Sequence, residues 1–561
     1  MKYLFRLALL LSLFLANHLA FGQSTFNQGD RPNILFIAID DLNDWIGCLN
    51  THPQVKSPVM DSLAKQGVLF TEAHCAAPVC GPSRTAIMSG LRPYTTGVYS
   101  NNANYPKRLP NTQSMPEYLH RNGYYTLGAG KLFHGDDNWP KGSFDDYIKE
   151  GSGPFPGKAL DTSLQNPTYT FEIDGKKFTT PLNGMPPDRS WRPSHSFDWG
   201  SVDLPDGAFK DAQSVAWIVD KLKDDYKKPF FMSMGFHLPH QPMFAPKRFH
   251  DMYPVDKVKL PPYLENDLDD LSSAGREYAL IPATSGMHRT VVAFDQWHNA
   301  VSSYLATVTF VDHLLGQVMD ALRRSPYADN TWIFLWSDHG WHLGEKDHWG
   351  KATGWFRATR VPMMVIPPKN MAPRGFKAGS TCDSPVNLID LFPSVCEVAG
   401  LPIPAELDGH SLMPLVKNPK SAWGDHSITT FGRGNHAITT KRWSYIQYFD
   451  GSAELYDREK DPNEWKNLIH DKRQQDVVMK LKAYVPKEPQ YKHFIRYDRF
   501  KAVIPADGSP MLLYNLGYQN NIEERASDAE DYPEVVATIQ TWLDQHKPTD
   551  KRIIISDSYP Y

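Results

Sequence analysis

Two pairs of adjacent polar residues follow apolar segments in this chain and could together hold a metal ion. Asp40 and Asp41 follow one apolar run, and Asp338 and His339 follow another. Either pair alone is also typical of a helix cap or a loop. Three carboxylates at close quarters repel each other unless a cation holds them. Oxygen-rich ligation favours a hard ion such as Ca²⁺ or Mg²⁺, whereas zinc prefers sites rich in nitrogen and sulfur.

Basic side chains follow the same kind of apolar run. Lys131 and His134 come after one run, and His237 comes after another. Any one of them could be a solvated lysine or a structural histidine. Together with Arg84 and Lys351, they would surround a divalent cation with positive charge. Such an oxyanion pocket stabilises the charge on a sulfuryl or phosphoryl group during its transfer.

One cysteine, Cys80, opens the stretch CGPSRTAIMSG. Pro82 suits the first turn of a helix, which would place Cys80 at the positive end of the helix dipole. A buried cysteine acting as a small apolar residue is one interpretation, and a thiolate nucleophile is another. Neither accounts for the Cys-x-Pro-Ser-Arg context formed by Cys80, Pro82 and Arg84.

The elements that must position these side chains alternate between strands and helices. The run 33–39 is apolar, rich in β-branched residues and too short for a helix, which indicates a strand buried on both faces. Similar runs occur in YYTLGAGKLFHG, PFFMSMGFHLPH and TWIFLWSDHGWHLG. Helical patterns cover 57–66, 211–223 and 295–323, with Ser57 as the expected cap of the first helix and Pro58 in its first turn.

This alternation predicts an α/β fold with a large, mixed, mostly parallel sheet flanked by helices. Ligands of such sheets bind beyond the carboxyl ends of the strands. Four apolar runs end in acids, histidines or a lysine, so we expect these side chains to meet at one edge of the sheet.

Composition describes an ordinary folded protein. The chain has 561 residues, 41% hydrophobic residues and a formal net charge of -4, which suits one large and one smaller unit. Without a basic excess, nucleic acid is not an expected partner, and an anionic substrate must bind at a local site. An odd count of five cysteines leaves at least one unpaired, and Cys80 is the candidate.

The first 22 residues have the pattern of a secretory signal peptide. Lys2 and Arg6 precede an apolar run, and small residues follow at Ala20 and Gly22. The junction carries no cysteine for a lipid anchor, and no later stretch reaches the roughly 18 apolar residues of a membrane span. We therefore expect an exported protein, periplasmic or secreted, without a membrane anchor.

The remaining chain divides into three parts. We expect the catalytic domain at 23–423, with long surface loops at 150–210 that shape a substrate cleft. Shorter alternating runs at 424–485 predict a small α+β subdomain with an antiparallel sheet. The segment 486–561 is an extension that packs on this subdomain or on the cleft.

Taken together, the motifs resemble those of the sulfatase family. CGPSRTAIMSG is similar to the sulfatase signature, in which the cysteine is oxidised to formylglycine after translation. ILFIAIDDLNDWIGC resembles the metal strand of the family, and GYYTLGAGKLFHG resembles its Gly-Lys-x-x-His element. GFHLPHQPMFAPKRF, SDHGWHLGEKDHWGK and ELYDREKDPNEWKNL resemble the iduronate-2-sulfatase branch. The likeness covers about 31–485.

The resemblance implies an alkaline-phosphatase-like fold and a set of roles. The expected ligands of one Ca²⁺ are Asp40, Asp41, Asp338, His339 and the modified side chain of Cys80. Arg84 and Lys131 would stabilise the hydrated aldehyde, and His134 would take its proton. His237 and Lys351, with Lys131, would bind the sulfate and assist the leaving oxygen, and Trp341 and His342 would contact the sugar. A formylglycine-generating enzyme is the implied maturation partner.

The resulting hypothesis is an exported sulfatase that acts on a sulfated polysaccharide or its oligosaccharides. A 2-O-sulfate on a uronic acid, in ulvan, fucoidan, carrageenan or a glycosaminoglycan, is the substrate type that the branch suggests. One alternative is a phosphate or phosphonate monoester hydrolase of the same superfamily, against which the full Cys-x-Pro-Ser-Arg context argues. An alternative of another class is an inactive homologue that binds carbohydrate.

Overall fold

The protein is described here from a computed structural model. It describes residues 31–101, 105–135, 140–149, 169–173, 176–180, 182–186, 197–281, 286–487, 491–497, 500–505, 510–515, 529, 532–548 and 552–556. The predicted signal peptide at 1–22 lies outside these residues, as do parts of the predicted loops at 150–210 and of the extension at 486–561.

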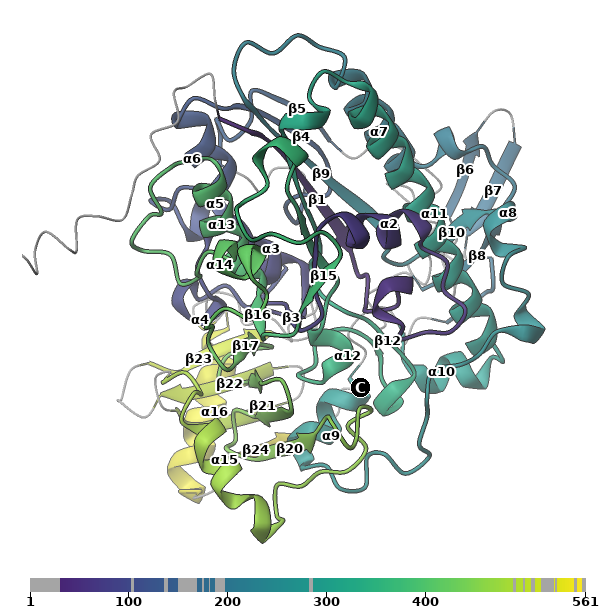
Figure 1. Ribbon diagram of the computed structural model, residues 1–561. Helices are drawn as coiled ribbons and strands as arrows, with labels where there is room; N and C mark the ends of the chain where they lie inside the picture. The colour runs from purple at the N-terminus through teal and green to yellow at the C-terminus, as the bar shows by residue number, and fades with distance from the viewer. Residues whose placement is uncertain are drawn as a thin grey trace, which may run out of the picture.

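An eight-stranded sheet forms the centre of the molecule (Figure 1). Its strand order is β15-β2-β14-β11-β1-β9-β4-β5. The strands are β1 (Asn33–Asp40), β2 (Val68–Phe70), β4 (Tyr125–Gly130), β5 (Asp146–Ile148), β9 (Phe230–Pro239), β11 (Thr331–Ser337), β14 (Met363–Ile366) and β15 (Ser380–Cys382). The pairs β11–β14 and β14–β2 are antiparallel, and the other five are parallel. The prediction of a mixed, mostly parallel sheet is confirmed.

Both faces of the sheet are covered, as the apolar sequence of β1 predicts. Alternate residues of this strand point to opposite faces. Leu35, Ile37 and Ile39 belong to one core, whereas Ile34 and Phe36 belong to the other. The first core includes residues of α2 (Pro58–Gln66), α7 (Lys210–Lys221) and α11 (Trp297–Arg324), and the second includes residues of α3 (Cys80–Ser89), α6 (Met115–Arg121) and α13 (Leu391–Val398).

The three predicted helices occur as α2, α7 and α11, but the expected cap of α2 is wrong. The Ser57 side chain makes no capping hydrogen bond, because its Oγ accepts from the Gly47 N–H at 2.8 Å. The carboxylate of Asp312 on α11 instead accepts from the N–H groups of Val59 and Met60, at 3.0 and 2.8 Å. A neighbouring helix therefore supplies the acceptor that the first turn of α2 needs.

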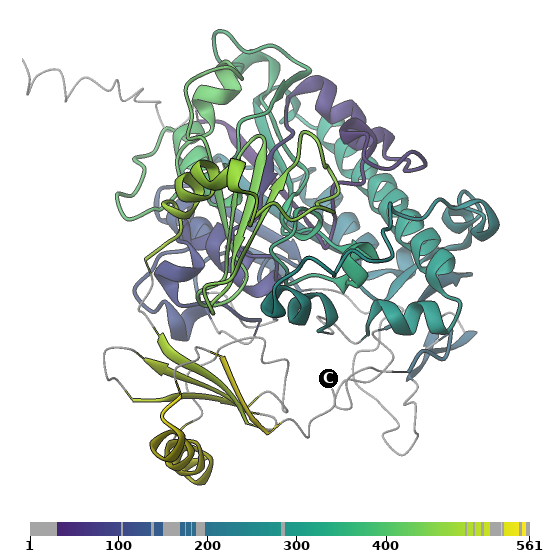
Figure 2. The same cartoon turned by 90° about the horizontal axis from the view of Figure 1, so that it is seen from below.

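Two smaller sheets follow the large domain. Helix α15 packs on the antiparallel sheet β17-β18-β19-β20, and helix α16 packs on the sheet β23-β22-β21-β24. Figure 2 shows the second sheet and its helix at the edge of the molecule. The first sheet and its helix are β17 (Ser427–Thr430), β18 (His436–Thr439), β19 (Trp443–Gln447), β20 (Ala453–Asp457) and α15 (Gln475–Lys482). The second set is β21 (Tyr491–Tyr497), β22 (Phe500–Pro505), β23 (Leu512–Asn515), β24 (Arg552–Ser556) and α16 (Pro533–His546).

The five cysteines all fall in the described part of the chain, and all are free thiols. Within the described residues, no helix has the length and apolar character that crossing a membrane requires.

Candidate active site

Four neighbouring parallel strands bring the predicted site residues to one edge of the sheet. The strands β11, β1, β9 and β4 lie side by side and run in the same direction. Asp338 follows β11, Asp40 ends β1, and Lys131 follows β4. The expected convergence of strand ends is therefore confirmed, because parallel strands present their carboxyl ends at a common edge.

Cys80 faces this edge from the first turn of α3, which is buried throughout. The main-chain N–H of Gly81 donates to Asn101 Oδ1 at 2.7 Å, and Gly90 ends the helix with a φ of 69°. Glycine adopts this left-handed conformation without steric cost. The Cys80 Sγ atom lies 2.9 Å from Lys351 Nζ, 3.3 Å from His339 Nε2, 3.9 Å from Asp41 Oδ1 and 4.0 Å from Lys131 Nζ.

The carboxylates around Cys80 form a candidate metal site. Two groups of side chains have ligand atoms within 4.8 Å of one another; they are Asp40, Asp41, Cys80 and His240, and Asp40, Cys80, Asp338 and His339. The Oδ2 atom of Asp41 is buried and has no hydrogen-bond partner in the described part of the chain. A buried carboxylate oxygen without a partner is costly, so this donor set fits a hard cation.

The backbone also fixes the position of Asp41. Its φ of 59° is unusual for a residue other than glycine. The hydroxyl of Tyr304 donates to the Asp41 carbonyl at 2.9 Å, and the Asp41 N–H donates to Asp338 Oδ1 at 3.1 Å. These two hydrogen bonds hold the turn that points Asp41 toward Cys80.

The pKa values of the three acids show that they are not stable as three free carboxylates. Burial raises the pKa of Asp41 to about 8 and that of Asp338 to about 6. Burial also raises the pKa of Asp40, but Lys131 and Arg84 outweigh it and hold that pKa well below its usual value. Additional positive charge, as a divalent cation would supply, favours ionisation of all three.

Three basic side chains interleave with these acids. Arg84 donates from Nε to Asp338 Oδ2 at 2.9 Å and from Nη2 to Asp40 Oδ1 at 3.2 Å. Lys131 Nζ pairs with Asp40, and Lys351 Nζ pairs with Asp41 Oδ1 at 2.7 Å. The three cations of the predicted oxyanion pocket, Arg84, Lys131 and Lys351, therefore lie in one cluster, each paired with a carboxylate.

These charges favour an anion at position 80. Burial and Asp40 raise the pKa of the Cys80 thiol, but Lys131, Lys351 and His339 outweigh them and lower it well below its usual value. Burial and Lys351 lower the pKa of His339, yet Asp338 and Cys80 outweigh them and raise it to about 9.

Gly235 leaves room for the main chain of Lys131 at the edge of the cluster. Its N–H donates to the carbonyl of Gly235 at 2.9 Å, and a Cβ at Gly235 would lie 1.8 Å from the Lys131 carbonyl oxygen. A side chain at position 235 would therefore push the strand end away.

Sequence reasoning missed His240, the second histidine of His-Leu-Pro-His. Its Nε2 lies 3.9 Å from Asp41 Oδ2, and its Nδ1 contacts the Gln241 carbonyl at 2.5 Å. The predicted residue, His237, is half-buried; its ring centroid is 4.7 Å from that of His240, and its main-chain N–H donates to Asp211 Oδ1 at 2.7 Å. Because β9 continues to Pro239, the residue just beyond the strand is His240 and not His237.

Three other predicted residues lie close in sequence to Lys131 and Lys351. His134 is half-buried on the segment that follows Lys131. Trp341 is 1% exposed and belongs to the core, where Lys351 Nζ lies 5.4 Å from the centre of its ring.

The ring nitrogens of His342 contact Thr353 Oγ1 at 3.0 Å and the Glu345 carbonyl at 3.1 Å, and the residue is fully buried. Both side chains are therefore buried, as those of Cys80 and Arg84 are, and contact of Trp341 and His342 with the sugar stays a prediction. Both pack beneath the segment that carries Lys351.

That segment is held by His348. Its Nε2 lies 2.8 Å from the Lys351 carbonyl, and its Nδ1 lies 2.9 Å from the carbonyl of Ala279 on α9 (Ser273–Leu280). The ring is buried, so it fixes the main chain of the catalytic lysine candidate against α9.

The sheet carries a cluster of cations and carboxylates at the ends of its parallel strands, an arrangement that fits the hydrolysis of an ester with an anionic group. The sulfatase profile matches residues 32–401, and a profile described as N-sulphoglucosamine sulphohydrolase, C-terminal, matches residues 344–490. The chain therefore belongs to the sulfatase family and is a sulfuric ester hydrolase.

Individual relatives agree with this family. The chain is 38% identical to a sulfatase of Formosa agariphila over 82% of this chain and 87% of that protein. It is 33% identical to the iduronate 2-sulfatase of Mus musculus over 67% of this chain and 70% of that protein.

Two solved structures share the fold at lower identity. A phosphonate monoester hydrolase from Silicibacter pomeroyi has a TM-score of 0.64 at 21% identity, covering 81% of this chain and 94% of that chain. A 2-O GAG sulfatase has a TM-score of 0.59 at 20% identity, covering 81% of this chain and 90% of that chain.

Proposed function

We propose that the protein is an exported sulfatase that removes sulfate from a sulfated carbohydrate with a formylglycine formed from Cys80. The observation that carries this proposal is the placement of Cys80. Its side chain lies at the first turn of a buried helix, among Lys131, Lys351 and Arg84, within the Cys-x-Pro-Ser-Arg context. A formylglycine-generating enzyme would be the maturation partner.

The acids of the site would hold one Ca²⁺. We assign Asp40, Asp41, Asp338 and His339, together with the oxygen of modified residue 80, as its ligands. The buried Asp41 Oδ2, which accepts no hydrogen bond from the described residues, supports this assignment. When bound, the ion supplies positive charge that stabilises negative oxygen atoms at the reacting centre.

The nucleophile is the hydrated aldehyde of residue 80, a geminal diol. One hydroxyl would lose its proton to a carboxylate of the cluster as its oxygen forms a bond to sulfur; the bond between sulfur and the substrate oxygen would break, and that oxygen would take up a proton and leave as the sugar alcohol. The second hydroxyl then loses its proton, its oxygen forms the aldehyde double bond, and the carbon–oxygen bond to sulfate breaks. The next water molecule hydrates the aldehyde again, so no oxidant or reductant is consumed.

The surrounding side chains bind and move protons. Arg84 and Lys131 orient the diol, and Lys351 and Lys131 bind the sulfate oxygens. We assign His240 as the donor of the proton to the leaving alcohol, with His237 as the ring that supports it. His134 is proposed to accept the diol proton during release of sulfate.

The substrate class follows from relatives and from the fold together. A relative is named iduronate 2-sulfatase and a structural neighbour a 2-O GAG sulfatase. Another neighbour was solved with neocarrahexaose. These names support a sulfated polysaccharide or oligosaccharide, with a 2-O-sulfate on a uronic acid as the first candidate. Export rests on the signal-peptide pattern of residues 1–22.

Turnover of matched esters tests the proposal. We expect the mature enzyme to hydrolyse 4-nitrophenyl sulfate with a higher kcat/KM than 4-nitrophenyl phosphate, and mass spectrometry to find an aldehyde at residue 80. Cys80→Ala should lower kcat by about 10³-fold or more, while Cys48→Ala, at another free cysteine, should retain activity. A preference for phosphate would favour the phosphonate hydrolase alternative, whose fold is shared. Full activity of Cys80→Ala would rule out the formylglycine mechanism.

A further inference from the structure

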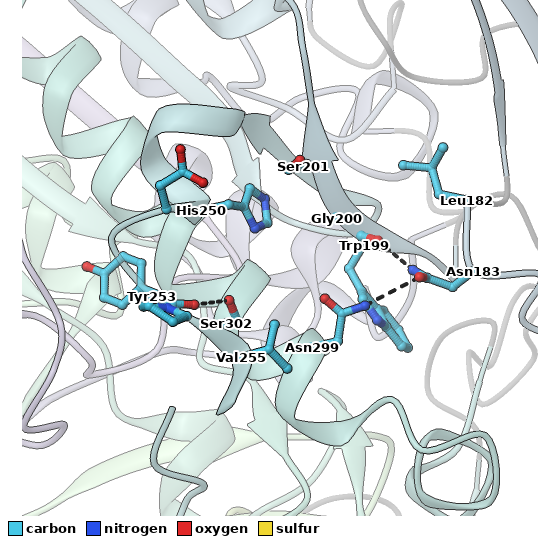
Figure 3. Close-up of a pocket in the computed structure, with 12 residues that line it drawn as sticks. Leu182, Asn183, Trp199, Gly200, Ser201, His250, Tyr253, Val255, Asn299 and Ser302 are labelled. Atoms are coloured by element: carbon cyan, nitrogen blue, oxygen red, sulfur yellow. Dashed lines mark hydrogen bonds between the residues drawn. The ribbon is translucent and has the colours of Figure 1, made fainter. Parts of the chain in front are cut away.

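A cavity lined by residues outside the Cys80 cluster lies in the large domain. It is bounded by β8 (Trp199–Val202), the turn after α8 (Lys247–His250) and the start of α11 (Figure 3). Its volume of about 620 Å³ is typical of sites that bind small molecules. The described residues that line it are distinct from the cluster around Cys80, so the mechanism above does not use this cavity.

Two asparagines in its wall are held in place by their neighbours. Asn183 Nδ2 donates to Asp198 Oδ1 at 2.6 Å and to the Trp199 carbonyl at 2.5 Å. Its Oδ1 accepts from Asn299 Nδ2 at 3.3 Å, and the same Nδ2 donates to Gln296 Oε1 at 2.8 Å. Figure 3 shows the Asn299 amide oxygen turned away from Asn183. Polar groups fixed in this way can bind a ligand with little further loss of side-chain entropy.

One ring nitrogen of a half-buried histidine in the same cavity has no hydrogen bond to the described residues. The Nε2 atom of His250 has no partner in the described part of the chain. Burial lowers the pKa of His250 to about 4, although an interaction with the Gly200 main chain opposes this, so the imidazole is neutral at pH 7. Figure 3 shows the ring between Tyr253 and Gly200. A ligand hydroxyl that reached this nitrogen would satisfy it.

The charge of the lining selects against an anionic ligand. Among the described lining residues, Asp251 is the charged one; it is exposed and pairs with Lys247. No lysine or arginine is among those lining residues, whereas a sulfate group is bound best by cationic donors. At the rim, Leu182 and Val255 are 44% and 45% exposed. Fixed amides, hydroxyls and exposed apolar edges suit a neutral, hydroxylated ring.

The cavity wall is connected to the catalytic centre by aromatic packing. The ring centroids of Trp199 and Trp349 are 5.6 Å apart, and Trp349 precedes Lys351 by two residues. We propose that this cavity binds an uncharged sugar unit of the carbohydrate whose sulfate ester enters the site at Cys80. This inference rests on the proposed function and adds a second binding point for the substrate.

Filling the cavity tests the inference. Ser201 lines it with an exposed side chain, so Ser201→Trp should block it, and Asn299→Ala should weaken it. The control is Ser62→Trp, at an exposed serine of α2. On the sulfated oligosaccharide that the mature enzyme desulfates fastest, we expect Ser201→Trp to raise KM about tenfold or more. Its kcat on that substrate and its kcat/KM on 4-nitrophenyl sulfate should match those of Ser62→Trp.

An unchanged KM on the oligosaccharide would overturn the inference. If the enzyme hydrolyses no sulfate ester, the proposed function fails, and binding then decides the fate of the cavity separately. For this, saturation-transfer NMR uses the methyl glycosides of galactose, glucose, xylose and N-acetylglucosamine. Transfer to at least one of them, lost in Ser201→Trp and kept in Ser62→Trp, would support the site. No transfer to any of the four would overturn it.

Discussion

The two histidines of the segment His-Leu-Pro-His differ in how far they reach toward the reacting centre. His240 lies beyond the end of β9 and approaches Asp41, whereas His237 is still within the strand and contacts the ring of His240. Burial lowers the pKa of His240 well below its usual value, with Lys131 and Lys351 acting in the same direction. A bound sulfate would counter these cations and favour the protonated ring that an acid requires.

We therefore expect His240→Asn to lower kcat by about 10²–10⁴-fold on a sulfated sugar, whose alcohol needs a proton to leave. The loss on 4-nitrophenyl sulfate should be smaller, because nitrophenolate leaves without a proton. His237→Asn is the matched control and should change kcat on both substrates by less than about tenfold. Equal losses for the two variants, or a larger loss for His237→Asn, would contradict the assignment of His240.

Removal of the metal ion is the second test at the scale of single residues. Burial raises the pKa of Asp41 to about 8, so this carboxyl is largely protonated at pH 7 in the ion-free site and should release its proton when Ca²⁺ binds. At a free ion concentration 100 times Kd, Ca²⁺ should stabilise the fold by about 2.7 kcal/mol. We expect a chelator to lower Tm and abolish turnover, and added Ca²⁺ to restore both.

The control for metal binding is an aspartate outside the cluster. Asp338→Ala should remove the increase of Tm that Ca²⁺ causes, whereas Asp320→Asn, on the exposed part of α11, should keep it. Restoration by Zn²⁺ but not by Ca²⁺ would contradict the choice of a hard cation.

How much of the site could be predicted depends on whether a residue's position follows from its own strand. Asp40 and Asp338 directly end continuous apolar strands, so their meeting follows from the order of elements alone. His240 was missed because β9 extends three residues beyond the apolar run. The burial of Trp341 could not be predicted, because the segments that cover it are distant from it in the sequence.

The same distinction holds for whole elements. The strands and helices of the large domain follow from local apolar patterns, and the structure has them within a few residues of the predicted ranges. The cap of α2 does not, because its acceptor, Asp312, lies 252 residues from Met60. Local sequence pointed to Ser57, which bonds the Gly47 loop instead.

The stability of the fold around helix α2 should accordingly depend on pH through Asp312. Burial raises the pKa of this carboxyl to about 6, above the usual value of 3.8. Well below pH 3.8 the group is protonated in both the folded and unfolded states, so its contribution to stability is fully present. Between about pH 3.8 and pH 6 the unfolded state loses this proton while the folded state keeps it. The free energy of unfolding therefore falls over this range, by about 3 kcal/mol at most.

Melting curves between pH 4 and pH 7.5 check this expectation. Asp312→Asn cannot ionise, so its Tm should rise relative to that of the unmodified protein as pH increases over this range. It also loses one acceptor for the α2 N–H groups, which should lower its Tm at pH 4 by a nearly constant amount. Asp320→Asn, on the same helix but exposed, should follow the unmodified protein; if Asp312→Asn does so too, the carboxyl does not titrate as described.

At the scale of the molecule, the sheet β17-β18-β19-β20 holds the segment that carries Lys351. Glu454 on β20 accepts from Trp355 Nε1 at 2.9 Å and from the hydroxyls of Tyr448 and Tyr456 at 2.8 Å each. A Cβ at Gly275 on α9 would lie 2.1 Å from Glu454 Oε1, so the glycine leaves room for this carboxylate.

A second acid secures both ends of the same segment. Glu464 Oε2 accepts from the Phe356 N–H at 2.8 Å, and its carbonyl accepts from Lys346 Nζ, which also pairs with Asp267 at 2.6 Å. The segment from Lys346 to Phe356 includes Lys351, so these contacts with Glu464 also hold the main chain that carries Lys351.

This coupling predicts that a change in the subdomain reaches the active site. Glu454→Ala leaves three buried donors without an acceptor, which should cost about 3 kcal/mol or more and lower Tm by several degrees. Because Trp355 and the segment before it then lose their anchor, kcat on 4-nitrophenyl sulfate should fall as well, even well below the new Tm. Glu459→Ala removes an exposed acid of the same subdomain and should change neither quantity. A lower Tm for Glu454→Ala with an unchanged kcat would show that the subdomain stabilises the fold without positioning Lys351.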